Sequence, residues 1–141
     1  MSHIIHTPII YSIVRKPLID GSPLAKTLHG VAAKGRLFLS AVSHGNILCE
    51  IDRIEEAPLR SEAHQNYGQL LAHVGSSRIL PFDEPVSRVW GEIRGIVRPG
   101  TSGASAEALM IAATSQAYGF KMIATHEEWH ELLPDVDFCH V

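Results

Sequence analysis

Short apolar stretches alternate along the chain with longer segments of helical periodicity, and this alternation constrains the fold more than any other feature. The apolar stretches are Ile4-Ile5 and residues 37–42, 79–82 and 122–124, and residues 136–138 are expected to add an edge strand. Residues 37–42 are apolar at nearly every position, as is typical of a strand buried on both faces. Strands that alternate with helices form parallel sheets through right-handed crossovers. The sequence therefore predicts a three-layer α/β/α sandwich around a parallel sheet of four or five strands.

The segments between these strands carry helix start signals. We expect side-chain N-caps at five positions: Thr7, Ser22, Ser43, Asp83 and Thr125. Pro8 and Pro23 would then stand at the first helical position, where a missing N–H is harmless. The clearest amphipathic pattern follows Asp83, and residues 105–118 form an Ala-rich helix that Gly119 is expected to close.

Composition narrows the class of protein. The chain has 141 residues, of which 45% are hydrophobic and 19% are charged, so we expect one folded domain, residues 1–141, and exclude disorder. A net charge of −3 gives no global attraction to nucleic acid, which makes RNA a possible but not an indicated partner. No apolar run approaches the ~20 residues that span a bilayer. Cys49 and Cys139 have no metal-binding spacing and are interpreted as reduced thiols, so we expect a cytoplasmic protein without a membrane partner.

Ligands of parallel sheets bind beyond the carboxyl ends of the strands. This rule selects His6, residues 43–46, Asp83 and residues 125–128 as the candidate site, and the helix start at 105–108 can join them. Most of the nine histidines are scattered; His3, His29, His64, His73 and His140 are interpreted as surface residues. His126 and His130 lie four residues apart on one short helical stretch, a spacing that can bind a transition metal.

Four segments in order resemble PIN-domain proteins of the VapC/FitB type. They are LFLSAVS at 37–43, RILPFD at 78–83, IAAT at 111–114 and IAT at 123–125, and their spacing matches over nearly the whole chain. These proteins are the toxin halves of toxin–antitoxin pairs and are often plasmid-stability proteins. The resemblance implies an Mg²⁺- or Mn²⁺-dependent ribonuclease with clustered carboxylates, since hard cations take oxygen ligands. It also implies a homodimer and a small antitoxin partner.

The chain departs from this pattern at the acidic positions. The first Asp is replaced by His6, the second carboxylate by Asn46, and the third by Ala108, with Glu107 beside it. The last polar position is Glu127, which is the best single candidate site residue. Two divalent ions would be poorly neutralised here, so we expect weak or no Mg²⁺ or Mn²⁺ binding and an impaired or inactive nuclease.

Each candidate also has a structural interpretation. His6 is either a ligand for a softer ion, such as Zn²⁺, Mn²⁺ or Ni²⁺, or a strand-end histidine bonded to backbone. Asn46 either orients a water molecule or lies on a helix surface. Glu107 is either a displaced metal ligand or an acid favoured by the helix dipole. His44 is a possible partner of His6 or faces solvent, and Glu128 is expected to form a capping box with Thr125.

The function predicted from these residues is a VapC/FitB-like toxin–antitoxin or plasmid-stability protein with impaired nuclease activity, a pseudoenzyme. Two alternatives remain. One is an active ribonuclease with a remodelled metal site made of His6, Asn46, Glu107 and Glu127. The other is a non-catalytic module that binds protein or nucleic acid.

Overall fold

The computed structural model describes residues 1–100 and 102–141, and within them one parallel sheet organises the chain. The strands are β1 (His3–Ile5), β2 (Leu37–Ser40), β3 (Ile79–Leu80), β4 (Lys121–Ala124) and β5 (Asp137–His140). The α-helices are α1 (Thr7–Arg15), α2 (Pro23–Ala33), α3 (Ala41–Asp52), α4 (Ala57–Val74), α5 (Glu84–Ile96) and α6 (Ala106–Tyr118), and the 3₁₀ helices are η1 (Ser76–Arg78) and η2 (Glu128–Leu132). The spatial order of the sheet is β3-β2-β1-β4-β5.

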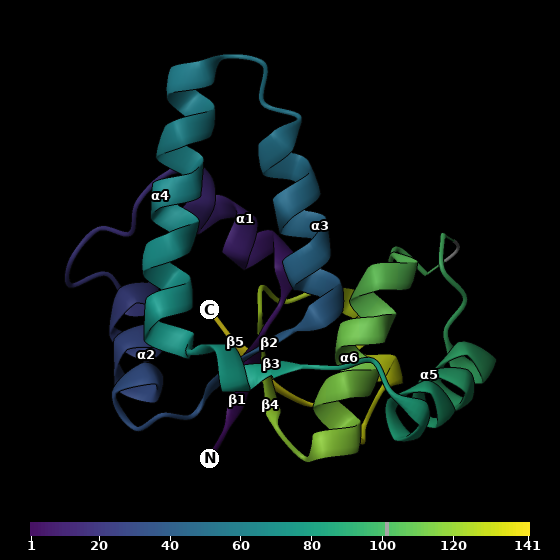
Figure 1. Ribbon diagram of the computed structural model, residues 1–141. Coiled ribbons are helices and arrows are strands. Elements are labelled where there is room, and N and C mark those ends of the chain that lie inside the picture. Colours follow the sequence, from purple (N-terminus) through teal and green to yellow (C-terminus); the bar gives the residue numbers. More distant parts are fainter. Residues whose placement is uncertain (101) are drawn as a thin grey trace.

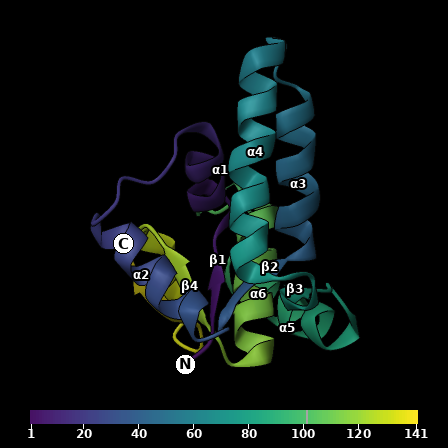
Figure 2. The same ribbon diagram turned by 60° about the vertical axis from the view of Figure 1, so that its left-hand side comes forward.

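Every strand pair in this sheet is parallel, and helices cover both faces (Figure 1). Neighbouring residues of β1 point into different cores: Ile4 packs with residues of α5 and α6, whereas Ile5 packs with residues of α1, α3 and α4. Met122 and Ile123 of β4 divide in the same way. Figure 2 shows α1–α4 gathered on one side and α5 and α6 on the other. The predicted three-layer α/β/α sandwich with a parallel sheet is confirmed, including β5 at the edge.

Two of the five predicted N-caps, Ser22 and Asp83, are confirmed, and Ser105, which was expected only as a helix start, also caps its helix. Ser22 accepts a hydrogen bond from the N–H of Ala25, Asp83 from that of Val86, and Ser105 from that of Ala108. Each precedes a helix that begins at the next residue. Gly119 ends α6 in the left-handed conformation, at φ +69°.

The other predicted caps are wrong. The cap of α1 is His6, and the Thr7 hydroxyl lies 2.8 Å from that of Ser43 instead. The strand expected over 37–42 ends at Ser40, which caps α3, because its hydroxyl accepts from the N–H of Val42. Ser43 is therefore a buried residue of the first turn.

The capping box expected between Thr125 and Glu128 is also wrong. The cap of η2 is Glu127, whose partner in the box is His130. His126 precedes this 3₁₀ helix, so His126 and His130 do not share one helical face.

Membrane insertion through a helix has no support among the described residues. None of their helices combines the length and the apolar character needed to cross a bilayer.

Replacing Ser105 by alanine is expected to lower the free energy of unfolding by about 1 kcal/mol, since the first turn of α6 loses its side-chain acceptor. Urea denaturation measures this loss. The matched control is Ser61→Ala on the exposed surface of α4, where alanine is the better helix former and stability should not fall. Equal stability of Ser105→Ala and the wild type would contradict the capping role.

Candidate functional site

Three of the predicted site residues meet in one groove at the carboxyl edge of the sheet. His6 follows β1, Asn46 lies one turn into α3 after β2, and Glu107 lies in the first turn of α6. The groove has a volume of about 570 Å³. Its other lining residues are Thr7, Pro8, Tyr11, Ile47, Cys49, Glu50, Arg53 and Ser105. The strand-end rule thus predicted that these three residues lie together, whereas Asp83 and residues 125–128, which it also selected, do not line the groove.

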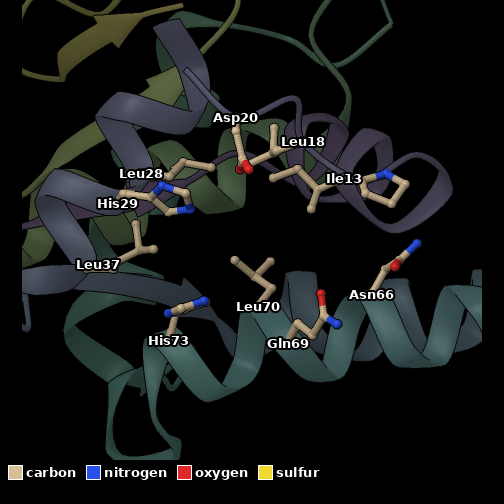
Figure 3. A pocket seen from close by; sticks show the side chains of 12 residues that line it. Ile13, Leu18, Asp20, Leu28, His29, Leu37, Asn66, Gln69, Leu70 and His73 are labelled. Carbon is tan, nitrogen blue, oxygen red and sulfur yellow. The ribbon is translucent and has the colours of Figure 1, made fainter. Parts of the chain in front are cut away.

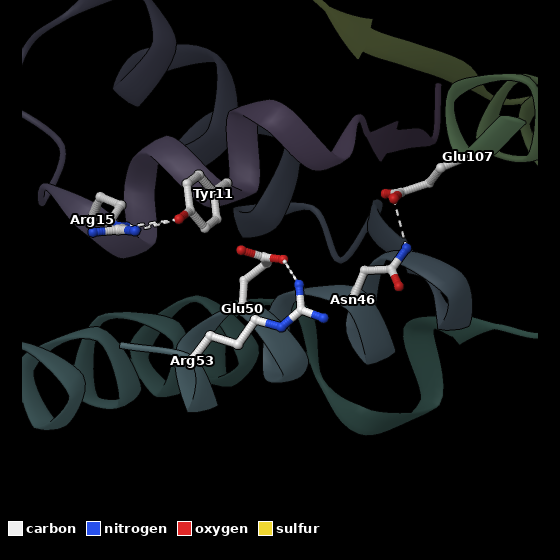
Figure 4. Close-up of polar contacts among 6 residues, drawn as sticks. All are labelled: Tyr11, Arg15, Asn46, Glu50, Arg53 and Glu107. Carbon is white, nitrogen blue, oxygen red and sulfur yellow. Dashed lines mark hydrogen bonds and ion pairs between the residues drawn. The ribbon is translucent and has the colours of Figure 1, made fainter. Parts of the chain in front are cut away.

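A hydrogen bond joins two of these residues across the groove. The side-chain amide of Asn46 donates to Glu107 Oε2 over 2.6 Å, between α3 and α6 (Figure 4). The other carboxylate oxygen, Glu107 Oε1, is buried and has no hydrogen-bond partner among the described residues. A carboxylate that accepts an amide N–H presents less free charge to a cation than an unpartnered one. The hydrogen bond from Asn46 therefore engages one of the two Glu107 oxygens that could otherwise bind a metal ion.

His6 forms the inner wall of the groove. Its residue is 6% exposed, and its backbone N–H donates to Ile123 O over 2.9 Å while its carbonyl accepts from the first turn of α1. Burial lowers the pKa of the imidazole below its ordinary value, and the charges of Glu127 and Glu107 oppose this shift. Burial has the larger influence, so His6 is neutral at pH 7. It supplies a nitrogen where the resemblance implies a carboxylate.

Glu127 does not line this groove. It lies in a neighbouring hollow of about 350 Å³, together with Ser102, Gly103, His126, Glu128 and Trp129. There its carboxylate accepts a hydrogen bond from the indole N–H of Trp129, and it caps η2. Its charge still influences the pKa of His6. Glu127 is thus near His6 but is engaged in local structure.

Ala108, the position that matches the family's third acid, is 4% exposed and belongs to the core between the sheet and α5 and α6. Glu107 lines the groove in its place. His44 does not pair with His6, because its Nδ1 lies 2.7 Å from the hydroxyl of Tyr67 on α4. His44 is half-buried by this contact and does not simply face solvent.

The donor set does not fit the Mg²⁺ or Mn²⁺ site that the resemblance implies. Within residues 1–100 and 102–141, no three His, Cys, Asp or Glu side chains are placed to hold a metal ion together. Near His6 the groove offers one carboxylate, Glu107, and that group already accepts from Asn46. Hard cations of this kind need several oxygen ligands and net negative charge.

The sequence interpretation missed one hydrogen-bonded pair and one ion pair at the outer end of the groove (Figure 4). Arg15 donates to the hydroxyl of Tyr11 over 2.9 Å, and Arg53 forms an exposed ion pair with Glu50 at 3.2 Å. Glu50 and Arg53 follow Asn46 by four and seven residues, so helical periodicity places all three on one face of α3. That periodicity was the signal that could have found them.

A second pocket lies away from this groove, between the end of α1, α2 and α4 (Figure 3). It has a volume of about 180 Å³ and an apolar lining that includes Ile13, Leu28 and Leu70. His29 and His73 enter it from α2 and α4, and their ring centroids lie 6.1 Å apart. These two histidines are exposed, as expected, but they are neighbours in space.

The chain was compared with known proteins. No protein-family model matches it. It is 22% identical to toxin FitB from Neisseria gonorrhoeae over 107 residues, which cover 67% of this chain and 77% of that protein. Similar solved structures include VapBC2 from Rickettsia felis bound to a DNA fragment from its promoter, with a TM-score of 0.82, 13% identity and coverage of 100% and 99%. They also include FitAcB from Neisseria gonorrhoeae, with a TM-score of 0.76, 20% identity and coverage of 96% and 95%. The chain therefore has the PIN-domain fold of the VapBC and FitAB toxin–antitoxin proteins, and its sequence is similar to that of toxin FitB over 107 residues.

Proposed function

We propose that this chain is the toxin-type member of a VapC/FitB-like toxin–antitoxin or plasmid-stability pair, and that it lacks Mg²⁺-dependent ribonuclease activity. The observation that carries the proposal is the hydrogen bond from the Asn46 amide to Glu107, beside the buried and neutral His6. This arrangement, which carries the single negative charge of Glu107, stands where the resemblance implies a cluster of carboxylates.

Metal-assisted cleavage of a phosphodiester needs bound cations that generate hydroxide and neutralise the phosphate. Here Glu107 is the carboxylate nearest to His6 in the groove, and Glu50 is paired with Arg53. Since the groove offers little uncompensated negative charge, it attracts divalent cations only weakly. The fold alone does not restore the activity.

An antitoxin partner is part of the proposal. The similar structures are VapBC and FitAB assemblies, and several of them are bound to DNA. The pocket between α1, α2 and α4, which is lined by both apolar and polar side chains, can receive a side chain of such a partner, and it does not depend on the lost carboxylates. We include in the proposal a homodimer, as the resemblance implies, together with the single domain expected from the length of the chain and the cytoplasmic location expected from its two cysteines.

The test is an RNA cleavage assay with unstructured RNA and the purified chain in Mg²⁺ or Mn²⁺, combined with calorimetric titration of each ion. We expect no cleavage above the metal-free control and no saturable binding in the groove. The variants Glu107→Gln and Glu127→Ala should then behave like the wild type.

The alternative is the remodelled metal site, which the unpartnered Glu107 Oε1 favours. Metal-dependent cleavage that Glu107→Gln or Glu127→Ala abolishes would establish this alternative and overturn our proposal. Cleavage that survives both substitutions would point to a contaminating nuclease. A separate co-purification with the product of the adjacent gene tests the partner, independently of the chemistry.

A further inference from the structure

Three histidines, His126, His130 and His140, gather at β5, outside the groove. The ring centroids lie 5.0 Å apart for His126 and His140, 5.2 Å for His130 and His140, and 6.1 Å for His126 and His130. His126 and His140 are exposed, whereas His130 is 5% exposed and stacks on Phe138 at 3.9 Å. We propose that His126 and His140 form a binding site for a borderline divalent cation such as Zn²⁺ or Ni²⁺, with His130 as the residue that positions His140.

The tautomers follow from the hydrogen bonds around His130. The backbone N–H of Glu127 donates to His130 Nδ1 over 3.4 Å, and we therefore assign the lone pair to this nitrogen and the ring proton to Nε2, which is buried without a partner among the described residues. The proton in the 3.0 Å contact between His130 Nδ1 and His140 Nε2 consequently belongs to His140.

This assignment leaves one nitrogen of His140 free. The rings of His130 and His140 are parallel within 2° and meet nitrogen to nitrogen, as expected of an N–H···N hydrogen bond. His140 Nδ1 then has an unused lone pair. Metal-binding histidines in proteins characteristically donate their other ring N–H to an acceptor that fixes tautomer and orientation, and His130 supplies that acceptor.

His126 lies at a suitable distance from His140. Two imidazoles that bind one tetrahedral ion, with metal–nitrogen distances of about 2.0 Å, have ring centroids about 5 Å apart. The observed separation is 5.0 Å, with the rings inclined by 69°. His29 and His73, at 6.1 Å, fit this geometry less well.

The chemistry of the pair selects the ion. Imidazole nitrogens suit Zn²⁺, Ni²⁺ and Cu²⁺, whereas Mg²⁺ requires oxygen ligands. With two protein ligands, water would complete the coordination. This agrees with the lack, in the described part of the chain, of three His, Cys, Asp or Glu side chains that converge on one point. The site would connect the segment after β4 to β5.

The first test is calorimetric titration of the whole chain with Zn²⁺ and with Ni²⁺. We expect His126→Ala and His140→Ala to abolish the highest-affinity event, and His130→Phe, which keeps the stacking on Phe138, to weaken it by about tenfold. His29→Ala and His6→Ala are the matched controls and should leave this event unchanged. No binding, or binding lost in a control and retained in His126→Ala, would overturn the proposal.

The second test uses only the wild type and therefore does not depend on how the variants fold. Nitrogen-15 NMR of the histidine rings in the wild type at pH 7 should show the Nε2–H tautomer for both His130 and His140. On addition of Zn²⁺, the Nδ1 resonance of His140 should shift the most. An Nδ1–H tautomer at His140 would refute the assignment.

Discussion

The double substitution His6→Asp/Asn46→Glu is expected to give Mg²⁺-dependent stability that the wild type lacks. It removes the amide donor from Glu107 and adds two carboxylates to the groove, which already holds Glu50 and Glu107; carboxylate oxygen is the ligand type that Mg²⁺ requires. Without metal, like charges close together should lower the free energy of unfolding. With Mg²⁺ at a hundred times its dissociation constant, binding should stabilise the variant by about 2.7 kcal/mol. Urea denaturation at increasing Mg²⁺ concentration measures both effects.

The matched control adds the same charge elsewhere. His64→Asp/Gln65→Glu makes the equivalent change on the exposed surface of α4. Its stability should show no saturable dependence on Mg²⁺. If Mg²⁺ stabilises the wild type as much as the groove variant, the groove already holds the ion, and our account of Asn46 and Glu107 is wrong.

Most of the fold could be predicted because the physical signals are local. An apolar stretch of three to six residues between turn signals identifies a buried strand, and Ser22, Asp83 and Ser105 each mark a helix start by a short polar side chain. The prediction failed where two elements share one apolar run. Residues 37–42 pass from β2 directly into α3, so Ser40 caps that helix in place of Ser43.

The position of the site could be predicted for a different reason. The carboxyl ends of parallel strands meet at one edge of the sheet, and this topology brings His6, Asn46 and Glu107 together whatever contacts their side chains make. What each side chain does there depends on tertiary packing. Neither the hydrogen bond from Asn46 to Glu107 nor the burial of Ala108 has a sequence signal.

The histidines show the same limit. His130 and His140 are ten residues apart, on a 3₁₀ helix and a strand, and no local pattern indicates that they form a hydrogen bond. Parallel pairing of β4 with β5 places His140 beside Ala124. Because His126 follows Ala124 by two residues, His126 also comes close to His140. The cluster therefore follows from sheet register, which the sequence alone did not provide.

The central strand is where a core substitution should cost most. Ile5 of β1 is fully buried between β2 and β4 and packs with residues of α1, α3 and α4. Ile5→Ala removes methyl groups from a core that cannot close around the space, so we expect a loss of about 2–5 kcal/mol in the free energy of unfolding. The denaturation midpoint should fall while its slope stays unchanged. Ile19→Ala, at a side chain that is 70% exposed, is the control and should change stability by less than about 0.5 kcal/mol. Equal effects of the two substitutions would mean that the sheet does not organise this core, and the placement of His6 at its edge would lose its basis.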